Sequence, residues 1–329
     1  MYRPSNLVDI FRSRDFHHFQ LALARSWYSE LVQGYQAKRN GEDEEILVER
    51  LVKVSNKSYP SKGRRRIKIA SKFIHGHRSQ IKYNDFNNGT HQCELGDMAV
   101  VSAVIENKKL LFQRLCFIQN KKGKHNRASI TWIIDSVQLF LLKHFPAISG
   151  VSGILKGHKN IEFLNRSRCL GAYGLLYSPG EMIFVSAPVI ADSMKGKKSI
   201  NSRDIAFPPV LSHNAIWPQW YPYWCCGLLM PETFPPFYCG SRPICGNTVF
   251  TRDIYDFIMA WTQLNIGEIL VYNGDVLDNK AYKLATAMIH MVLPGSIDGP
   301  PSDAPEVEIP DHDAGIGIFV YIIDISQQG

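Results

Sequence analysis

The sequence has few of the features that would place it outside the ordinary globular class. Seven cysteines in 329 residues are too sparse for a disulfide scaffold, and their odd number favours a reducing compartment. The N-terminus lacks the apolar core of a signal peptide. The longest stretch without charge, residues 205–231, is interrupted by prolines and cannot form a membrane helix. Since a hydrophobic fraction of 45% excludes disorder, we expect a cytoplasmic globular protein with no membrane partner.

Several motifs of nucleotide and ester chemistry are also missing. The sequence contains no P-loop, no G-x-G-x-x-G, no G-x-S-x-G and no H-E-x-x-H. Nucleotide hydrolysis, dinucleotide-dependent redox chemistry and serine or zinc hydrolysis therefore have no support. No internal repeat indicates a solenoid.

Positive charge is concentrated in the first part of the chain. Residues 1–130 carry 24 of the 37 basic and 12 of the 30 acidic side chains, a net charge of +12, which leaves −5 for residues 131–329. Basic clusters of this kind neutralise phosphates, although a solvated basic face without a partner is the alternative. The predicted nucleic-acid contacts are Arg64, Arg65, Arg66, Lys68, Lys72, Lys122, Lys124 and Arg127.

Hydrophobic periodicity predicts an α/β (α+β) fold. Apolar residues at helical spacing indicate a helix over 16–37, and alternation indicates a strand over 64–75. The segments 93–105 and 110–119 are predicted to be the two strands of a hairpin, joined by a tight turn at 106–109. The order continues with a helix over 129–145 and a hairpin over 171–190 that turns at 178–180. Two further helices (251–264 and 279–293) and a strand (315–325) follow.

Three polar residues are placed at one end of the predicted central hairpin. Asp97 lies early on the first strand, and Gln119 and Lys121 lie at the end of the second. Because residues two apart on a strand share a face, Gln119 and Lys121 point the same way, opposite Asp97. A carboxylate, a carbonyl oxygen and an ammonium are the groups that hydrolyse a phosphodiester with Mg²⁺ or Mn²⁺.

This pattern resembles the core of the PD-(D/E)xK nucleases, the restriction-endonuclease-like superfamily. It also resembles a group of bacterial proteins with a GD-leading strand, a QxK strand end and a Gln-x-x-Leu-x-x-x-x-Pro helix, for which a role in restriction or phage defence is suggested. The resemblance implies a mixed central sheet flanked by helices over residues 1–190. It further implies metal ligation by Asp97 and Gln119 and a catalytic role for Lys121. Residues 191–329 are then an extension that serves oligomerisation or a protein partner.

Two positions depart from the family pattern. Gln119 stands where an acidic residue is usual, so the ligand brings no charge, and Gly96 stands where proline is usual. The resemblance implies an additional acid, for which Glu94 and Glu30 are the candidates. Lys122 is predicted to face away from Lys121 and to contact phosphate.

Other interpretations stay open. The fold can have lost catalysis through Gln119, leaving a nucleic-acid-binding or scaffolding subunit, and the substrate can be RNA, although DNA is the expected one. Cys225, Cys226, Cys239 and Cys245 can bind zinc but lack paired knuckles, and the ring-rich segment 217–224 can stack on bases or pack internally. His75, His77 and His91 are interpreted as surface residues or phosphate contacts before a metal site.

Overall fold

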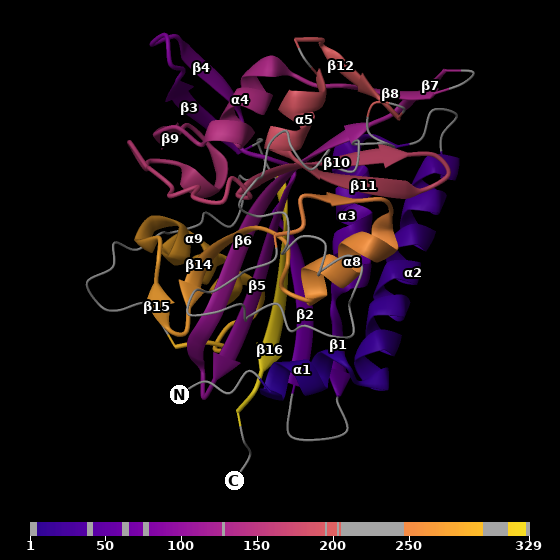
Figure 1. Ribbon diagram of the computed structural model, residues 1–329, viewed down its shortest axis with the longest axis vertical. Helices are drawn as coiled ribbons and strands as arrows, with labels where there is room; N and C mark the ends of the chain where they lie inside the picture. Colours follow the sequence, from indigo (N-terminus) through magenta and orange to yellow (C-terminus); the bar gives the residue numbers. More distant parts are fainter. Residues whose placement is uncertain are drawn as a thin grey trace, which may run out of the picture.

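A mixed sheet forms the centre of the described structure, with helices on both of its faces (Figure 1). The structure, a computed structural model, describes residues 5–37, 42–60, 66–74, 79–126, 129–194, 196–202, 204, 247–298 and 315–326. Within these ranges the sheet has ten strands, in the order β1-β2-β16-β5-β6-β10-β11-β13, with β14 and β15 attached along β6. The predicted α/β class, a mixed sheet flanked by helices, is confirmed.

The strands of this sheet differ in length, and the longest are central. They are β1 (Lys57–Pro60), β2 (Arg66–Ile74), β5 (Met98–Glu106), β6 (Lys109–Lys122), β10 (Gly171–Tyr177), β11 (Glu181–Ser186), β13 (Phe250–Thr251), β14 (Glu268–Tyr272), β15 (Asp275–Val276) and β16 (Ile316–Asp324). β5 pairs antiparallel with β6, and β6 pairs parallel with β10 through its second half and antiparallel with β14 through its first half.

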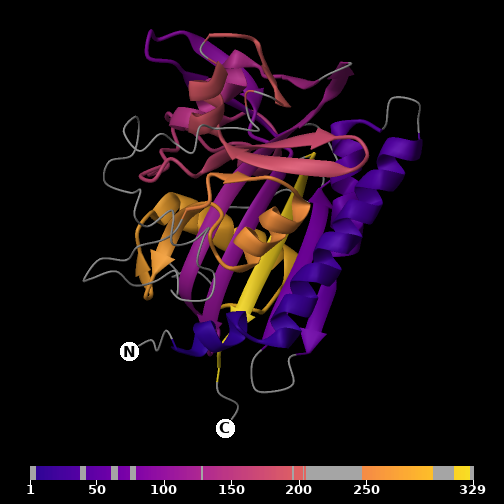
Figure 2. The ribbon, with the colours of Figure 1, turned by 45° about the vertical axis from the view of Figure 1, so that its right-hand side comes forward.

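Two hydrophobic clusters, one on each face, hold helices against the sheet. One cluster joins α2 (Arg14–Ala37), α3 (Glu44–Ser55) and α8 (Ile254–Thr262) to the side chains of Met98 and Val100. The other joins α4 (Ser136–His144), α5 (Ala187–Met194) and α9 (Asn279–Val292) to those of Ala99 and Val101. Alternate residues of a strand point to opposite faces, so β5 is buried on both sides. Figure 2 shows α2 along one side of the sheet, with α1 (Ser5–Phe11) below it.

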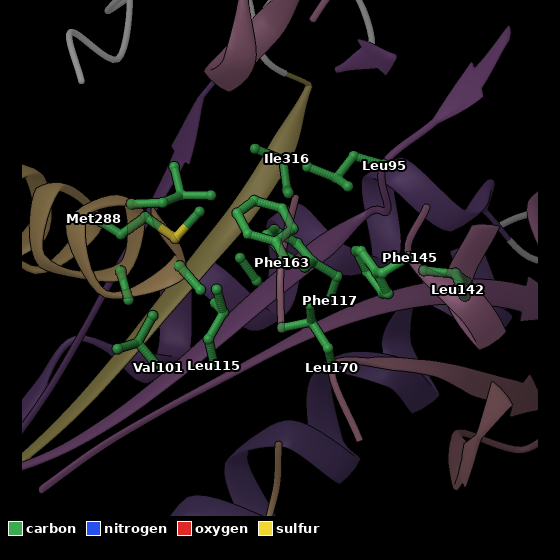
Figure 3. Close-up of a cluster of buried hydrophobic side chains, with 14 of the residues drawn as sticks. Leu95, Val101, Leu115, Phe117, Leu142, Phe145, Phe163, Leu170, Met288 and Ile316 are labelled. Atoms are coloured by element: carbon green, nitrogen blue, oxygen red, sulfur yellow. The ribbon is translucent and has the colours of Figure 1, made fainter. Parts of the chain in front are cut away.

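Large side chains fill the cluster on the α4 face (Figure 3). Phe117 from β6 lies near Phe145, which follows α4, and near Phe163; the ring centroids are 5.9 Å and 6.5 Å from that of Phe117. Met288 of α9 and Ile316 of β16 extend the same cluster. The packing anchors α4 over the upper ends of β5 and β6, where the candidate site lies.

Two small sheets stand at that upper end (Figure 1). One contains β3 (Gln80–Asn84), β4 (Thr90–Glu94) and β9 (Ile148–Gly150), and the 3-10 helix η1 (Gly153–Leu155) follows β9. The other contains β7 (Lys124–Asn126), β8 (Ser129–Ile133) and β12 (Ser199–Asn201). No helix in the described ranges has both the length and the apolar character needed to cross a bilayer.

Most predicted elements are present, and the helix expected over 129–145 is the main correction. Its first part is the strand β8, in which Trp132 is buried and Ile133 is exposed. Asp135 then begins α4 as its N-cap, because its Oδ1 accepts a hydrogen bond of 2.9 Å from Gln138 N. The alternation of Ile, Thr and Trp before this cap favours a strand over a helix.

Strand β16 completes the middle of the sheet. It lies between β2, to which it is antiparallel, and β5, to which it is parallel. Eight of its nine residues are buried. The predicted boundary at residue 190 therefore does not divide the sheet, since β16, β14, α8 and α9 pack with the strands that precede that boundary.

Removal of residues 315–329 is expected to prevent folding. Without β16, the facing edges of β2 and β5 lose their hydrogen-bond partners, and both hydrophobic clusters lose side chains. The measurement is thermal unfolding followed by circular dichroism, with removal of residues 327–329 as the control. A cooperative transition at an unchanged midpoint in the longer truncation would contradict a central role for β16.

Candidate active site

The backbone at Asp97 is fixed by a glycine turn between two strands. β4 ends at Glu94 and β5 begins at Met98, and between them Gly96 has φ +155°, a conformation that residues with a side chain rarely adopt. A Cβ at Gly96 would lie 3.2 Å from the carbonyl oxygen of Ile118. Asp97 N donates to that same oxygen at 3.0 Å, and Asp97 O accepts from Gly317 N at 2.9 Å. Asp97 is thus held between β6 and β16.

The structure brings Asp97 and Gln119 together, as predicted from the hairpin. Gln119 Nε2 donates to Asp97 Oδ2 at 2.6 Å, and Asn120 N donates to the same oxygen at 2.7 Å. The Gln119 amide is in turn held by α4, because Gln138 Nε2 donates to Gln119 Oε1. Gln138 Nε2 also lies 3.4 Å from the carbonyl oxygen of Glu94. One hydrogen-bonded chain therefore runs from α4 through β6 to the Asp97 carboxyl.

The Asp97 carboxyl is partly buried and lies near one acidic side chain, Glu94, and one basic side chain, Lys121. Burial raises the pKa of Asp97 to about 7, and the nearby Glu94 raises that pKa further, whereas the hydrogen bond from Asn120 N and the charge of Lys121 oppose the shift. Near neutral pH this carboxyl exchanges between its protonated and charged forms. A cation bound here would favour the charged form, because it would replace the proton.

Lys121 and Lys122 lie on opposite faces of β6, as expected from strand alternation. Lys121 shares the face of Gln119 and is half-buried. Lys122 faces α3: its Nζ donates to Glu42 O at 2.9 Å, and its backbone N donates to Glu44 Oε1 at 2.8 Å. The ammonium of Lys122 thus contacts the backbone just before α3. The sequence predicted a phosphate contact for Lys122 and did not predict this contact within the protein.

Of the two additional acids, only Glu94 lies beside Asp97. Glu30 lies on α2, which packs on the opposite face of the sheet from α4. Its carboxylate Oε2 is 3.3 Å from Nη1 of Arg50, whose Nε also binds Glu42 at 2.5 Å. The structure therefore places Glu30 in an ion-pair network between α2 and α3 and does not bring it to Asp97.

Lys72 is the predicted basic residue best placed near the site. Ile67 and Ile69 of β2 belong to the cluster of α2 and α3, so Lys68 and Lys72 face the other side, the side of Asp97. Lys72 pairs with Ile318, and Ile318 pairs with Ala99. At the usual strand spacing, Lys72 is about 10 Å from β5 near Asp97. Lys68 lies farther along β2, and Lys124 is exposed on β7.

The remaining predicted residues divide between two situations. Only the backbone of Arg66 is described, as the first residue of β2, and His91 Nε2 pairs with Asp85 Oδ2 at 2.9 Å. The others fall outside the described residues: Arg64, Arg65, Arg127, His75, His77, Cys225, Cys226, Cys239, Cys245 and the segment 217–224.

Some of the residues at the site, but not all, have the chemistry needed to bind a divalent cation. Carboxylates and carbonyl oxygens are the ligands of Mg²⁺, and Asp97 with the neighbouring Glu94 supplies the former. Gln119, however, turns its amide nitrogen toward Asp97, so its oxygen becomes a ligand only after the amide has turned over. The described part of the chain holds no group of three or more His, Cys, Asp and Glu residues placed for a metal ion, and the predicted pair of Asp97 and Gln119 contains a single acid.

Three residues around this pair were not assigned a role from the sequence. Gln138 was noted only as part of a helix pattern, although it holds the Gln119 amide. Tyr173 and Asn120 are buried, and the structure gives the Tyr173 hydroxyl and both amide atoms of Asn120 no hydrogen-bond partner among the described residues. Tyr173 pairs with Gln119 in register on β10, and burial raises the pKa of its hydroxyl. The signal for Tyr173 was the strand over 171–177 that follows the helix, which pairs with β6 and places Tyr173 beside Gln119.

Scans against protein-family models, curated proteins and solved structures found no match to this chain. The assignment of a function therefore depends on the geometry of the site.

Proposed function

We propose that this chain hydrolyses DNA phosphodiester bonds with Mg²⁺ or Mn²⁺ and has a restriction-endonuclease-like core. The observation that carries this proposal is the convergence of Asp97, Gln119 and Lys121 at one end of the β5–β6 pair, with Glu94 beside Asp97. Asp97 directly precedes β5 and Gln119 lies on β6, and the antiparallel pairing of these two strands places the Asp97 carboxyl within hydrogen-bond distance of the Gln119 amide. An effector role in bacterial defence is part of the same proposal.

Each residue has a separate task in this reaction. The chemistry that a divalent cation would supply at this site is Lewis acidity, which makes water a better nucleophile. Asp97 would hold the cation with its carboxylate, whose Oδ2 accepts the hydrogen bonds from Asn120 N and Gln119 Nε2. Lys121 orients the attacking water and stabilises the negative charge that develops on the phosphate. Gln138 donates a hydrogen bond to Gln119 Oε1 and thereby fixes the orientation of the Gln119 amide. Gln119 Oε1 would become available to a cation only if both amides turned over.

Lys68, Lys72 and Lys124 are the described residues that would hold the DNA backbone. Phosphate contacts of this kind position a duplex without reading its sequence. We therefore expect weak sequence specificity, or specificity that a partner supplies.

One observation favours a second candidate, a nucleic-acid-binding or scaffolding protein without catalysis. The Gln119 amide donates a hydrogen bond to the Asp97 carboxyl, so this pair needs no cation between its side chains. An acidic residue at position 119 would instead repel Asp97 unless a cation lay between the two carboxylates. Salt-dependent DNA binding without metal-dependent turnover would support this candidate. Cleavage of structured RNA but not of DNA would instead assign the same chemistry to RNA.

Replacement of Lys121 tests the proposal directly. Lys121→Ala is expected to lower plasmid cleavage in Mg²⁺ or Mn²⁺ by about 100- to 1,000-fold, the usual cost of removing one group that stabilises a developing charge. The matched control is Lys109→Ala, at the opposite, exposed end of the same strand, which removes the same charge and is expected to leave cleavage unchanged. Equal cleavage by wild type and Lys121→Ala, or cleavage that persists in a chelator, would contradict the proposed mechanism.

A further inference from the structure

An exposed aromatic group lies beside α4, outside the site described above. Phe86, in the turn between β3 and β4, is 74% exposed. Its ring centroid is 4.9 Å from that of Phe140 and 4.9 Å from that of His144, both on α4, and both contacts are edge-to-face. Tyr83 also stacks on Phe140, with 5.7 Å between the ring centroids. Phe86 therefore presents an exposed aromatic face that is backed by the partly exposed rings of Phe140 and His144.

The turn that carries Phe86 is held in place by its own hydrogen bonds. Asp85 Oδ1 accepts from Asn87 N and Gly89 N, each at 2.8 Å, and Asp85 Oδ2 binds His91 at 2.9 Å. The Asp85 carboxylate is therefore engaged by the turn. Since the ring is presented from a fixed backbone, little conformational entropy is lost when a ligand packs on it.

Two basic side chains lie close to these rings. Residues 143–168 carry five basic side chains and one acidic one, a net charge of +4 in the half of the chain that is otherwise acidic. Lys143 and Arg168 lie close enough to His144 to lower its pKa, although burial is the larger cause of that shift. The imidazole is thus a neutral ring with two cations beside it.

The aromatic group is connected to the candidate site through the same elements. Gln138, which holds the Gln119 amide, lies on α4 two residues before Phe140. Glu94, beside Asp97, pairs with Gln80 at one end of the β3–β4 hairpin, and Phe86 lies at the other end. The strand rise places Phe86 about 15 Å from Glu94. In Figure 1, α4 and this hairpin lie together at the upper end of the sheet.

We propose that Phe86, Phe140 and His144 form a stacking surface for unpaired bases of single-stranded nucleic acid, and that Lys143 and Arg168 contact its phosphates. This inference rests on the proposed function, because it specifies the form of the nucleic acid that reaches the site. Every base presents an aromatic face, so the surface accepts any sequence. The net positive charge favours a polyanion over a neutral or basic peptide as the occupant.

The experiment measures the binding of a labelled oligothymidine strand and of a labelled duplex to the full chain in a chelator, by fluorescence anisotropy. Phe86→Ala is expected to weaken single-strand binding about tenfold, the loss of one stacked base, and to leave duplex binding unchanged. Phe86→Trp is expected to retain single-strand binding. Val276→Ala, which truncates a 46% exposed side chain on β15, is the control and is expected to bind as wild type does.

The outcomes separate this inference from the proposed function. Single-strand binding by Phe86→Ala that equals wild-type binding, with duplex binding and plasmid cleavage intact, overturns only the stacking surface. Single-strand binding that is undetectable in wild type, while the duplex binds, also overturns it and leaves a protein partner as the occupant. Absence of binding to either nucleic acid overturns both proposals.

Discussion

Asp97→Asn is expected to abolish metal-dependent cleavage and, at the same time, to make the folded protein more stable above neutral pH. The loss of cleavage follows because an amide cannot supply the negative charge that holds the cation. The gain in stability follows because asparagine keeps the oxygen that accepts from Gln119 Nε2 and Asn120 N but carries no charge. A residue that served only the fold would show the opposite effect on stability.

The pH dependence of this effect has a definite sign. The pKa of Asp97 is raised to about 7 in the folded protein, chiefly by burial, whereas an unfolded Asp titrates near about 3.9. The folded state therefore binds a proton that the unfolded state has lost, so the stabilising contribution is present at low pH and is lost as pH rises through about 7. At pH 8, Asp97→Asn is expected to gain about 2 kcal/mol, half or less of the full-burial cost because Asp97 is partly exposed.

The measurement is the free energy of unfolding in urea between pH 5 and pH 8, in a chelator. The difference between Asp97→Asn and wild type is expected to be small at pH 5 and to grow toward pH 8. Asp85→Asn is the matched control, because the hydrogen bond from His91 lowers the pKa of Asp85 and its charged form is the stabilised one. That control is expected to lose stability. A loss of stability in Asp97→Asn at pH 8 would assign Asp97 a structural role.

Gln119→Glu is expected to make the stability of the protein strongly dependent on Mg²⁺. In a chelator, the new carboxylate would replace an amide nitrogen that lies 2.6 Å from Asp97 Oδ2, so two acids would share one site and the midpoint of thermal unfolding would fall. Added Mg²⁺ would neutralise the pair and raise the midpoint above that of wild type at the same concentration. At 100 times the dissociation constant, such a ligand contributes about 2.7 kcal/mol.

This substitution also separates the two candidate functions. Under the nuclease proposal, wild type cleaves plasmid DNA and Gln119→Glu reaches the same rate at a lower Mg²⁺ concentration. Under the non-catalytic alternative, wild type is inactive and Gln119→Glu gains cleavage. Gln92→Glu, an exposed position on β4 with the same chemical change, is the control and is expected to leave the response to Mg²⁺ unaltered. An identical Mg²⁺ response in wild type and Gln119→Glu would exclude a cation at this position.

The sequence predicted the strands of the site because its signals there are local. The strand patterns on either side of the turn at 106–109 were enough to place Asp97 opposite Gln119, and the hydrogen bond between their side chains agrees with that placement. The break between β4 and β5 was not predicted, because a strand pattern continues through Gly96 and only the positive φ of that residue interrupts it.

The rest depended on contacts between distant parts of the chain. The fixing of the Gln119 amide by Gln138 needs the docking of α4 on the sheet, and the separation of Glu30 from Asp97 needs knowledge of which face α2 covers. The position of β16 in the sheet also has no local signal, because an apolar strand suits any buried place between two others. Hydrophobic periodicity in the sequence shows which face of a helix or strand a residue lies on, but it does not show which other element packs against that face.

The position of β16 sets an order of events during protein synthesis. It is the last of the described elements to leave the ribosome, yet it lies beside β5, and its Gly317 N binds the carbonyl oxygen of Asp97. Pairing of strands so far apart in sequence is slow. The edges of β2 and β5 that face β16 therefore keep unpaired backbone groups until residues 316–324 have been synthesised. A chain that terminates before β16 thus carries every residue of the candidate site without its assembled geometry, and the site forms only after β16 has been synthesised.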